Sequence, residues 1–444
     1  MATNISFSRI QQLAIPAIIA GIAEPVLSIT DSAVVGNIPE YGTESLAAVG
    51  IVGSFLSMLI WILGQTRSAI SAIVSQNLGA GKLKDLDSFP AQAIYFNVAA
   101  GVVVLLGTYF FIEEIFRLLN AEGTILQFSI DYYNIRVWGF PLTLFTFAIF
   151  GLFRGLQNTF WPMVIAAIGA GLNILLDFML VYGVEGWWEP MNLKGAAYAS
   201  LIAQSVMALM AFGFLVKKTT VTLRLTFPLH PEIKRLVSMS LHLFVRTLAL
   251  NAALLLAVRE ATGLGKEYIA AHAIAINIWF FTAFFLDGYG AAGNILSGKL
   301  LGARDFVTLK KLVKKVSTYN AFVALGLIVL GVILYQPIGR MFNKDPEVLN
   351  VFYGMFYLVL VCQPLNALGF TLDAVFKGLG EMKFLRNVLL GATLFGFIPV
   401  LYASKILGWG LQGIWLALLV WIGYRGVALL IKFRKKYAPL AVSP

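Results

Sequence analysis

Residues 160–183 read FWPMVIAAIGAGLNILLDFMLVYG, an apolar stretch in which Asp177 is the one charged residue. As an α-helix this stretch is about 36 Å long at 1.5 Å per residue. That length crosses a hydrocarbon core of about 30 Å. The stretch therefore predicts a transmembrane helix.

Similar apolar stretches recur along the whole chain. Hydrophobic residues make up 59% of the 444 residues and charged residues only 12%, whereas a soluble domain carries about 25% charged residues. Hydropathy predicts about twelve spans, which cover residues 10–36, 45–76, 88–112, 127–153, 160–183, 195–216, 236–258, 268–297, 309–335, 349–376, 384–404 and 411–431. We therefore expect an all-α integral membrane protein embedded in a lipid bilayer.

The basic residues indicate the orientation of the spans. Lys and Arg concentrate in alternate loops, as in residues 310–315 and 432–436, and such loops face the cytoplasm. Both termini are thus predicted to be cytoplasmic in the cell inner membrane. The basic residues that give the net charge of +11 lie in these loops and do not form a basic patch on one face of a domain. We therefore expect no nucleic-acid partner. One cysteine and three histidines exclude a disulfide framework and a Cys/His metal cluster.

The second half of the chain repeats the first at a constant offset of 223 positions. Leu78-Gly79-Ala80 recurs as Leu301-Gly302-Ala303, and Pro141 recurs as Pro364. An offset kept without gaps indicates internal duplication. Six spans per repeat is an even number, so the two halves share one orientation in the membrane.

The duplication predicts a domain organisation. We expect two parallel six-helix bundles, residues 1–216 and 236–444, joined by a cytoplasmic linker, residues 217–235. A central cleft between two such bundles suits alternating access.

Polar residues in the first span are the first candidates for function. Glu24, Ser28 and Asp31 have i, i+4 and i+7 spacing and so share one helix face. Glu24 and Ser28 are candidates to line a substrate cleft, although Glu24 fits a membrane interface equally well. Pro16 and Pro25 remove helix hydrogen bonds and mark possible bending points. A static kink is the alternative.

Other candidates lie in the fifth and sixth spans. Asn173 and Asp177 form an i, i+4 pair, and Ser200 follows a run of small residues. A buried charge costs about 2.5–3.5 kcal/mol on insertion scales and seldom faces lipid. Burial and closeness of Asp31 and Asp177 would favour uptake of a proton, and an all-oxygen set could also hold Na⁺. The alternative is that these groups only satisfy one another inside the bundle.

The remaining unusual residues are expected to have structural roles. Ion pairing is expected for the charged residues within or near the ends of spans, which are Arg67, Arg136, Arg246, Asp131 and Asp287. Packing in the core is expected for His272 and Cys362. Residues 79–82 lack the spacing of a phosphate loop. Without a nucleotide-binding domain or a catalytic cluster, we expect no enzyme, and any pumping must use an ion gradient.

Several motifs together resemble one transporter family. Residues 25–36, PVLSITDSAVVG, resemble the first-helix signature of MATE (multidrug and toxic compound extrusion) exporters, as do 75–81, SQNLGAG, 154–159, RGLQNT, and 173–177, NILLD. Arg246-Thr247 and residues 270–272 and 285–288 are similar to the DinF branch. The likeness covers essentially the whole chain. Ala273 and Asn294 depart from the Gln and Glu usual in that branch.

The resemblance implies a function. The family's cation site would fall on Asp31, Asn173, Asp177 and Ser200, and the bend of helix one on Pro16. We expect a monomeric antiporter without a cofactor that exports small amphipathic, cationic drugs or toxins in exchange for H⁺, with Na⁺ as second choice. One alternative is a flippase of lipid-linked saccharides, and another is a membrane scaffold that transports nothing.

Overall fold

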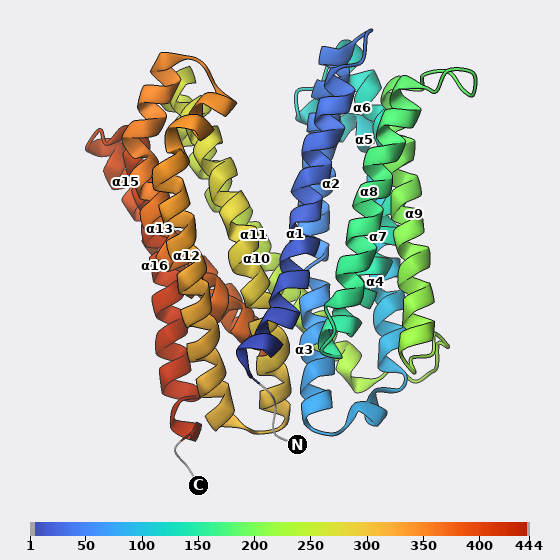
Figure 1. Ribbon diagram of the computed structural model, residues 1–444, viewed down its shortest axis with the longest axis vertical. Coiled ribbons are helices and arrows are strands. Elements are labelled where there is room, and N and C mark those ends of the chain that lie inside the picture. The colour runs from blue at the N-terminus through green and yellow to red at the C-terminus, as the bar shows by residue number, and fades with distance from the viewer. Residues whose placement is uncertain (1–4, 442–444) are drawn as a thin grey trace. The chain divides into compact units, whose positions relative to one another are not determined.

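The computed structural model describes residues 5–441, apart from the side chain of Glu24 (Figure 1). The described residues form helices and turns, with one isolated bridge between Val184 and Trp188 and no strand. Within the described residues, eleven helices are long and apolar enough to cross a membrane, or twelve if one bent pair is a single span. The predicted all-α membrane fold with about twelve spans is confirmed.

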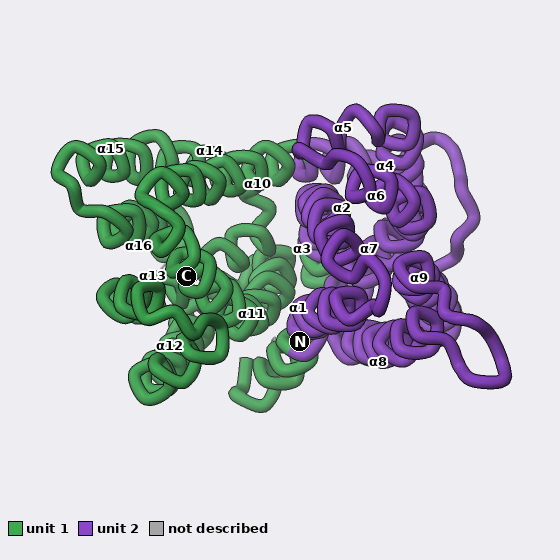
Figure 2. Tube along the Cα trace, turned by 90° about the horizontal axis from the view of Figure 1, so that it is seen from above, with its two compact units in different colours: residues 1–18, 75–82, 241–444 green, residues 19–74, 83–240 purple. Residues whose placement is uncertain are grey.

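The chain divides into two compact units, which Figure 2 colours separately. One contains residues 19–74 and 83–240, and the other contains residues 1–18, 75–82 and 241–444. These units differ from the predicted lobes because residues 1–18 and 75–82 group with the second-half helices. The lobe boundaries of 216 and 236 stay a prediction.

The first-half helices supply most of the unit of residues 19–74 and 83–240, although their residues 7–18 and 75–79 belong to the other unit. They are α1 (Phe7–Gly36), α2 (Gly42–Leu63), α3 (Thr66–Gly79), α4 (Phe89–Tyr109), α5 (Ile112–Leu118), α6 (Gly123–Arg136), α7 (Gly139–Gly155), α8 (Phe160–Tyr182) and α9 (Asn192–Lys218), with a 3₁₀ turn at Leu83–Leu86. Helices α8 and α9 pack along each other, as do α4 and α7.

The second-half helices supply most of the other unit, although their residues 231–240 belong to the first one. They are α10 (Pro231–Leu264), α11 (Lys266–Gly302), α12 (Phe306–Phe342), α13 (Pro346–Gly378), α14 (Met382–Gly391), α15 (Ile398–Ile406) and α16 (Gly410–Lys436), with a π segment at Ala392–Phe397 and a 3₁₀ turn at Pro439–Ala441. Helix α13 packs against α11, α12 and α16.

Two predicted spans contain a helix break. Residues 45–76 form α2 and α3, which separate at Gly64 and Gln65. Residues 127–153 form α6 and α7, which bend by 46°. Pro141 has no N–H for the carbonyl of Val137, the residue that follows α6. The equivalent Pro364 lies inside the unbroken α13, so the repeats differ here.

A proline also accounts for the irregular helix between α14 and α15. The π segment Ala392–Phe397 ends directly before Ile398-Pro399. Because proline cannot donate the helical hydrogen bond, the turn before it adopts a wider pattern.

Close helix contacts repeat with the sequence. A Cβ added at Gly155 would lie 2.5 Å from Val74 Cβ, and one added at Gly378 would lie 2.2 Å from Ser297 Oγ. Gly378 and Ser297 are the counterparts of Gly155 and Val74 at the 223 offset. Small residues allow helix backbones to approach in a bilayer, where packing drives association. The duplication is therefore visible in the packing of each half.

Candidate functional site

Helix α8 carries two polar residues of the candidate site on one face. Asn173 Nδ2 donates a hydrogen bond to Asp177 Oδ2 at 3.3 Å. Both side chains are buried, and Asp177 has 0% exposure. The shared face predicted from the i, i+4 spacing is present, and the role of the pair in ion binding stays a prediction.

Helix α1 brings a second carboxylate to this face of α8. The side chain of Asp31 is 9% exposed and lies close enough to Asp177 for the two carboxyl groups to interact. Tyr182, at the end of α8, donates a hydrogen bond from its hydroxyl to Val34 O at 2.7 Å. Val34 lies about one turn beyond Asp31, so this bond joins the two helices next to the carboxylates.

Helix α9 contributes Ser200 through its close packing on α8. A Cβ at Gly195 would lie 2.6 Å from the Leu180 carbonyl, so the glycine allows the α9 backbone to touch that of α8. Ser200 lies on α9 beyond this contact and is 3% exposed. Its hydroxyl has no hydrogen-bond partner among the described residues. The structure thus bonds Asn173 to Asp177, brings Asp31 near them, and includes Ser200 only by its position on α9.

Three buried oxygen atoms in this region have no partner in the described part of the chain. They are Asp31 Oδ1, Asp177 Oδ1 and Ser200 Oγ. Buried polar atoms are rarely left unpaired, and two neighbouring carboxylates disfavour simultaneous ionisation. A proton or a small hard cation would satisfy these oxygens. No group of three or more His, Cys, Asp or Glu side chains in the described structure suits a metal site.

Helix α6 adds two residues that sequence reasoning did not assign to the site. Tyr132 is buried and lies near both Asp31 and Asp177. The Arg136 guanidinium lies 5.8 Å from the Tyr132 ring centre and interacts electrostatically with Asp177. Arg136 Nε has no partner among the described residues. An arginine inside a predicted span is the available signal in the sequence, but the same signal predicts structural pairing.

The structure describes only some of the other first-span candidates, and Ser28 does not join this group. Ser28 is exposed, and its carbonyl accepts a hydrogen bond from Ser32 Oγ at 2.8 Å. The side chain of Glu24 lies outside the described part of the structure. Helix α1 runs unbroken through Pro16 and Pro25, so bending at either proline stays a prediction.

Most of the remaining unusual residues have structural surroundings. Arg246 pairs with Asp373 at 2.6 Å, Asp131 pairs with Lys194 at 3.5 Å, and Arg67 lies 5.0 Å from the Phe147 ring centre. The side chains of His272 and Cys362 are buried, as expected for packing, whereas Asp287 is exposed.

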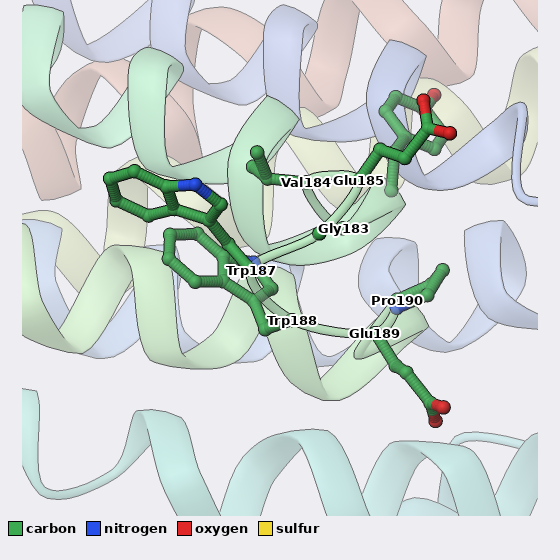
Figure 3. A pocket seen from close by; sticks show the side chains of 9 residues that line it. Gly183, Val184, Glu185, Trp187, Trp188, Glu189 and Pro190 are labelled. Carbon is green, nitrogen blue, oxygen red and sulfur yellow. The ribbon is translucent and has the colours of Figure 1, made fainter.

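The loop between α8 and α9 forms a shallow pocket of about 480 Å³ (Figure 3). Tyr182, Gly183 and the residues up to Pro190 line it, including Trp187, Trp188 and Glu189. Trp188 Nε1 donates a hydrogen bond to Met179 O at 2.9 Å, and Trp187 is exposed. Tryptophans at the end of a span are typical of the membrane interface. This pocket contains none of the candidate site residues.

Comparison with a family model supports the internal repeat. The MatE model matches residues 16–179 and again residues 243–402. The two matches end 223 positions apart, the same offset as the sequence repeat, and together they cover well over half of the chain.

Curated relatives extend along the chain. DNA damage-inducible protein F of Escherichia coli K12 is 26% identical over 432 residues, which is 96% of this chain and 91% of that protein. Protein DETOXIFICATION 44, chloroplastic, of Arabidopsis thaliana is 26% identical, covering 95% of this chain and 81% of that protein. The probable multidrug resistance protein NorM of Thermotoga maritima is 22% identical, covering 95% and 91%.

Solved structures share the fold. A MATE crystal structure in the bent conformation has a TM-score of 0.89 at 21% identity and covers 97% of this chain and 95% of its own. The bent form of the Vibrio cholerae transporter VcmN has a TM-score of 0.89 at 17% identity, covering 98% and 97%. These values establish a common fold over the whole chain, and with the family match they place it among transporters and not enzymes. The chain belongs to the MatE family of multi-pass membrane transporters.

Proposed function

We propose that this transporter is a cation-coupled antiporter that exports small amphipathic, cationic organic compounds. The coupling ion is H⁺ in this proposal, with Na⁺ as the second choice. The protein works as a monomer in the cell inner membrane with both termini in the cytoplasm. Relatives named as multidrug resistance proteins support the substrate class.

The observation that carries the proposal is the buried pair of Asp31 and Asp177. Each carboxyl group has one oxygen without a partner, and the two groups come from different helices, α1 and α8. Two unit charges about 4 Å apart repel by about 4 kcal/mol at an effective dielectric constant of 20. The state in which the pair binds one cation is therefore favoured over the state in which both carboxylates are ionised and no cation is bound.

Binding of that cation changes how α1 packs. When both groups are ionised, their repulsion opposes the contact of Asp31 with Asp177. A bound proton removes this repulsion. A proton that enters from outside thereby stabilises one arrangement of α1 against α8, with Pro16 or Pro25 as the bending point. The ion and the substrate are coupled because they favour different arrangements, which is all that exchange requires.

The proposal is tested by transport in everted membrane vesicles with a fluorescent cationic dye. Gradients of pH and of Na⁺ are imposed separately, so the coupling ion is identified in the same assay. Asp31→Asn should abolish gradient-driven dye uptake. Asp131→Asn is the matched control, because it removes a carboxylate of the same half that pairs with Lys194 and not with Asp177.

Normal gradient-driven uptake by the Asp31→Asn protein would contradict the proposal. Absence of dye movement by the wild-type protein under either gradient would instead favour the flippase or the scaffold.

A further inference from the structure

A second buried charge cluster lies in the unit of the second-half helices, on α10, α13 and α16. Arg246 Nη2 lies 2.6 Å from Asp373 Oδ1, and Arg425 Nη2 lies 3.8 Å from the same oxygen. Lys377 Nζ lies 3.1 Å from Asp373 Oδ2. One carboxylate therefore faces three cationic side chains.

The cluster has more positive charge than its carboxylate neutralises. The Arg246, Arg425 and Asp373 side chains are 6%, 4% and 8% exposed, and Lys377 is 14% exposed. No other carboxylate forms an ion pair with these cations in the described structure. Three cations and one anion leave an excess of two positive charges. Buried charges are costly unless they are paired.

Hydrogen-bond donors in the cluster also outnumber acceptors. Each arginine offers five N–H groups and the lysine three, whereas Asp373 offers two oxygens. Arg246 Nε is buried and has no partner among the described residues. The Arg425 guanidinium lies over aromatic rings, 5.0 Å from the Trp421 ring centre and 5.9 Å from that of Phe370. Aromatic faces attract the cation but supply no oxyanion.

A further unpaired donor lies on the same face of α13. Asn366 precedes Asp373 by seven residues, which is two helical turns, and Phe370 lies between them. Asn366 is 0% exposed, and neither Nδ2 nor Oδ1 has a partner in the described structure. Asn366 therefore leaves one donor and one acceptor unpaired, whereas the excess positive charge and the unpaired Arg246 Nε of the cluster both suit an oxyanion.

We propose that Arg246, Lys377 and Arg425 form a binding site for an anionic group, a phosphate or a carboxylate, with Asp373 as the resident anion that holds the three cations together. Arginine binds such groups through paired N–H donors. The source of the group is a phospholipid headgroup or a soluble organic anion. The site does not depend on the proposed antiport, because binding to it is measured without transport.

The test follows thermal unfolding of the full-length protein in detergent while inorganic phosphate is added at constant ionic strength. Phosphate stabilises many proteins non-specifically by exclusion from their surface. The readout is therefore the phosphate concentration that gives half of a saturable shift in the unfolding temperature. Asp373→Asn raises the excess charge from two to three and should lower that concentration at least about tenfold. Arg425→Gln reduces the excess to one and should raise it at least about tenfold.

Two further variants separate charge from damage to the fold. Arg246→Gln combined with Asp373→Asn restores an excess of two, so its half-saturating concentration should return close to the wild-type value. Lys405→Gln is the matched control, because Lys405 is an exposed cation paired with Glu260 at 2.9 Å, and it should leave the concentration unchanged.

The sources of the anion are separated with nanodiscs. Stabilisation by phosphate in phosphatidylcholine nanodiscs indicates a soluble anion, whereas stabilisation only when phosphatidylglycerol is present indicates a headgroup. The proposal is overturned if no protein shows a saturable shift with either source. It is also overturned if Asp373→Asn and Arg425→Gln change the half-saturating concentration in the same direction.

Discussion

The contact between the two repeated Leu-Gly-Ala motifs makes a quantitative prediction. A Cβ at Gly302 would lie 1.9 Å from Gln76 O and 2.9 Å from Ala80 N, and one at Gly79 would lie 1.9 Å from Lys299 O. Carbon atoms rest about 3.5–4.0 Å apart, so in Gly302→Ala the two backbones must separate by more than about 1 Å. Over-packing of this kind costs about 1–3 kcal/mol. We expect the upper end, because the opposing atoms belong to the backbone.

The assay is the unfolding midpoint of the purified protein in detergent. Gly326→Ala, in α12, is the matched control, because nothing lies within 4 Å of its added Cβ. In a helix interior, glycine to alanine without a clash stabilises by about 0.5–1 kcal/mol. The two substitutions should therefore shift the midpoint in opposite directions. A Gly302→Ala protein as stable as Gly326→Ala would refute the reasoning.

Three further predictions concern the candidate site and the end of α16. Arg136→Gln removes the positive charge that interacts with Asp177, so the site should hold its proton more tightly and dye transport should persist to higher pH; an unchanged pH profile would count against this role. Gly195→Val places a side chain against the Leu180 backbone, so α9 should separate from α8 and transport should fall at least about tenfold. The control Gly213→Val should retain transport, because the space around Gly213 is open. Partial burial alone would raise the pKa of Glu381, but its hydrogen bonds from Lys436 and Tyr437 and the nearby cations hold that pKa below its usual range. Glu381→Gln should therefore lower the stability of the protein fully at pH values above the ordinary pKa of a glutamate, and the loss should vanish as the pH falls through the lowered pKa. The measurement is the difference in unfolding midpoint between the wild-type and Glu381→Gln proteins.

The spans and the repeat could be predicted from sequence because both follow from one-dimensional patterns. A helix that crosses the bilayer needs about 20 apolar residues, and the 223 offset needs only a comparison of the chain with itself. The breaks near Gly64 and Pro141 were missed because the apolar pattern continues across them. The effect of a proline depends on its surroundings, since Pro364 lies in an unbroken helix.

The candidate site could be predicted only in part. The spacing of Asn173 and Asp177 places them on one face, but the approach of Asp31 depends on how α1 packs against α8. Tyr132 was missed because an aromatic residue near a span end is ordinary in a membrane protein. The partner of Arg246 lies 127 residues away, and no local pattern indicates such a pairing.

The central claim is that the Asp31 and Asp177 pair exchanges a cation for the substrate. Proton release on substrate binding tests it most directly: a cationic dye is added to the purified protein in weakly buffered detergent solution, and the released protons are counted with a pH indicator. The wild-type protein and Asp131→Asn should each release about one proton per bound dye, and Asp31→Asn should release none. Equal proton release by Asp31→Asn and wild type, at equal dye binding, would contradict the account.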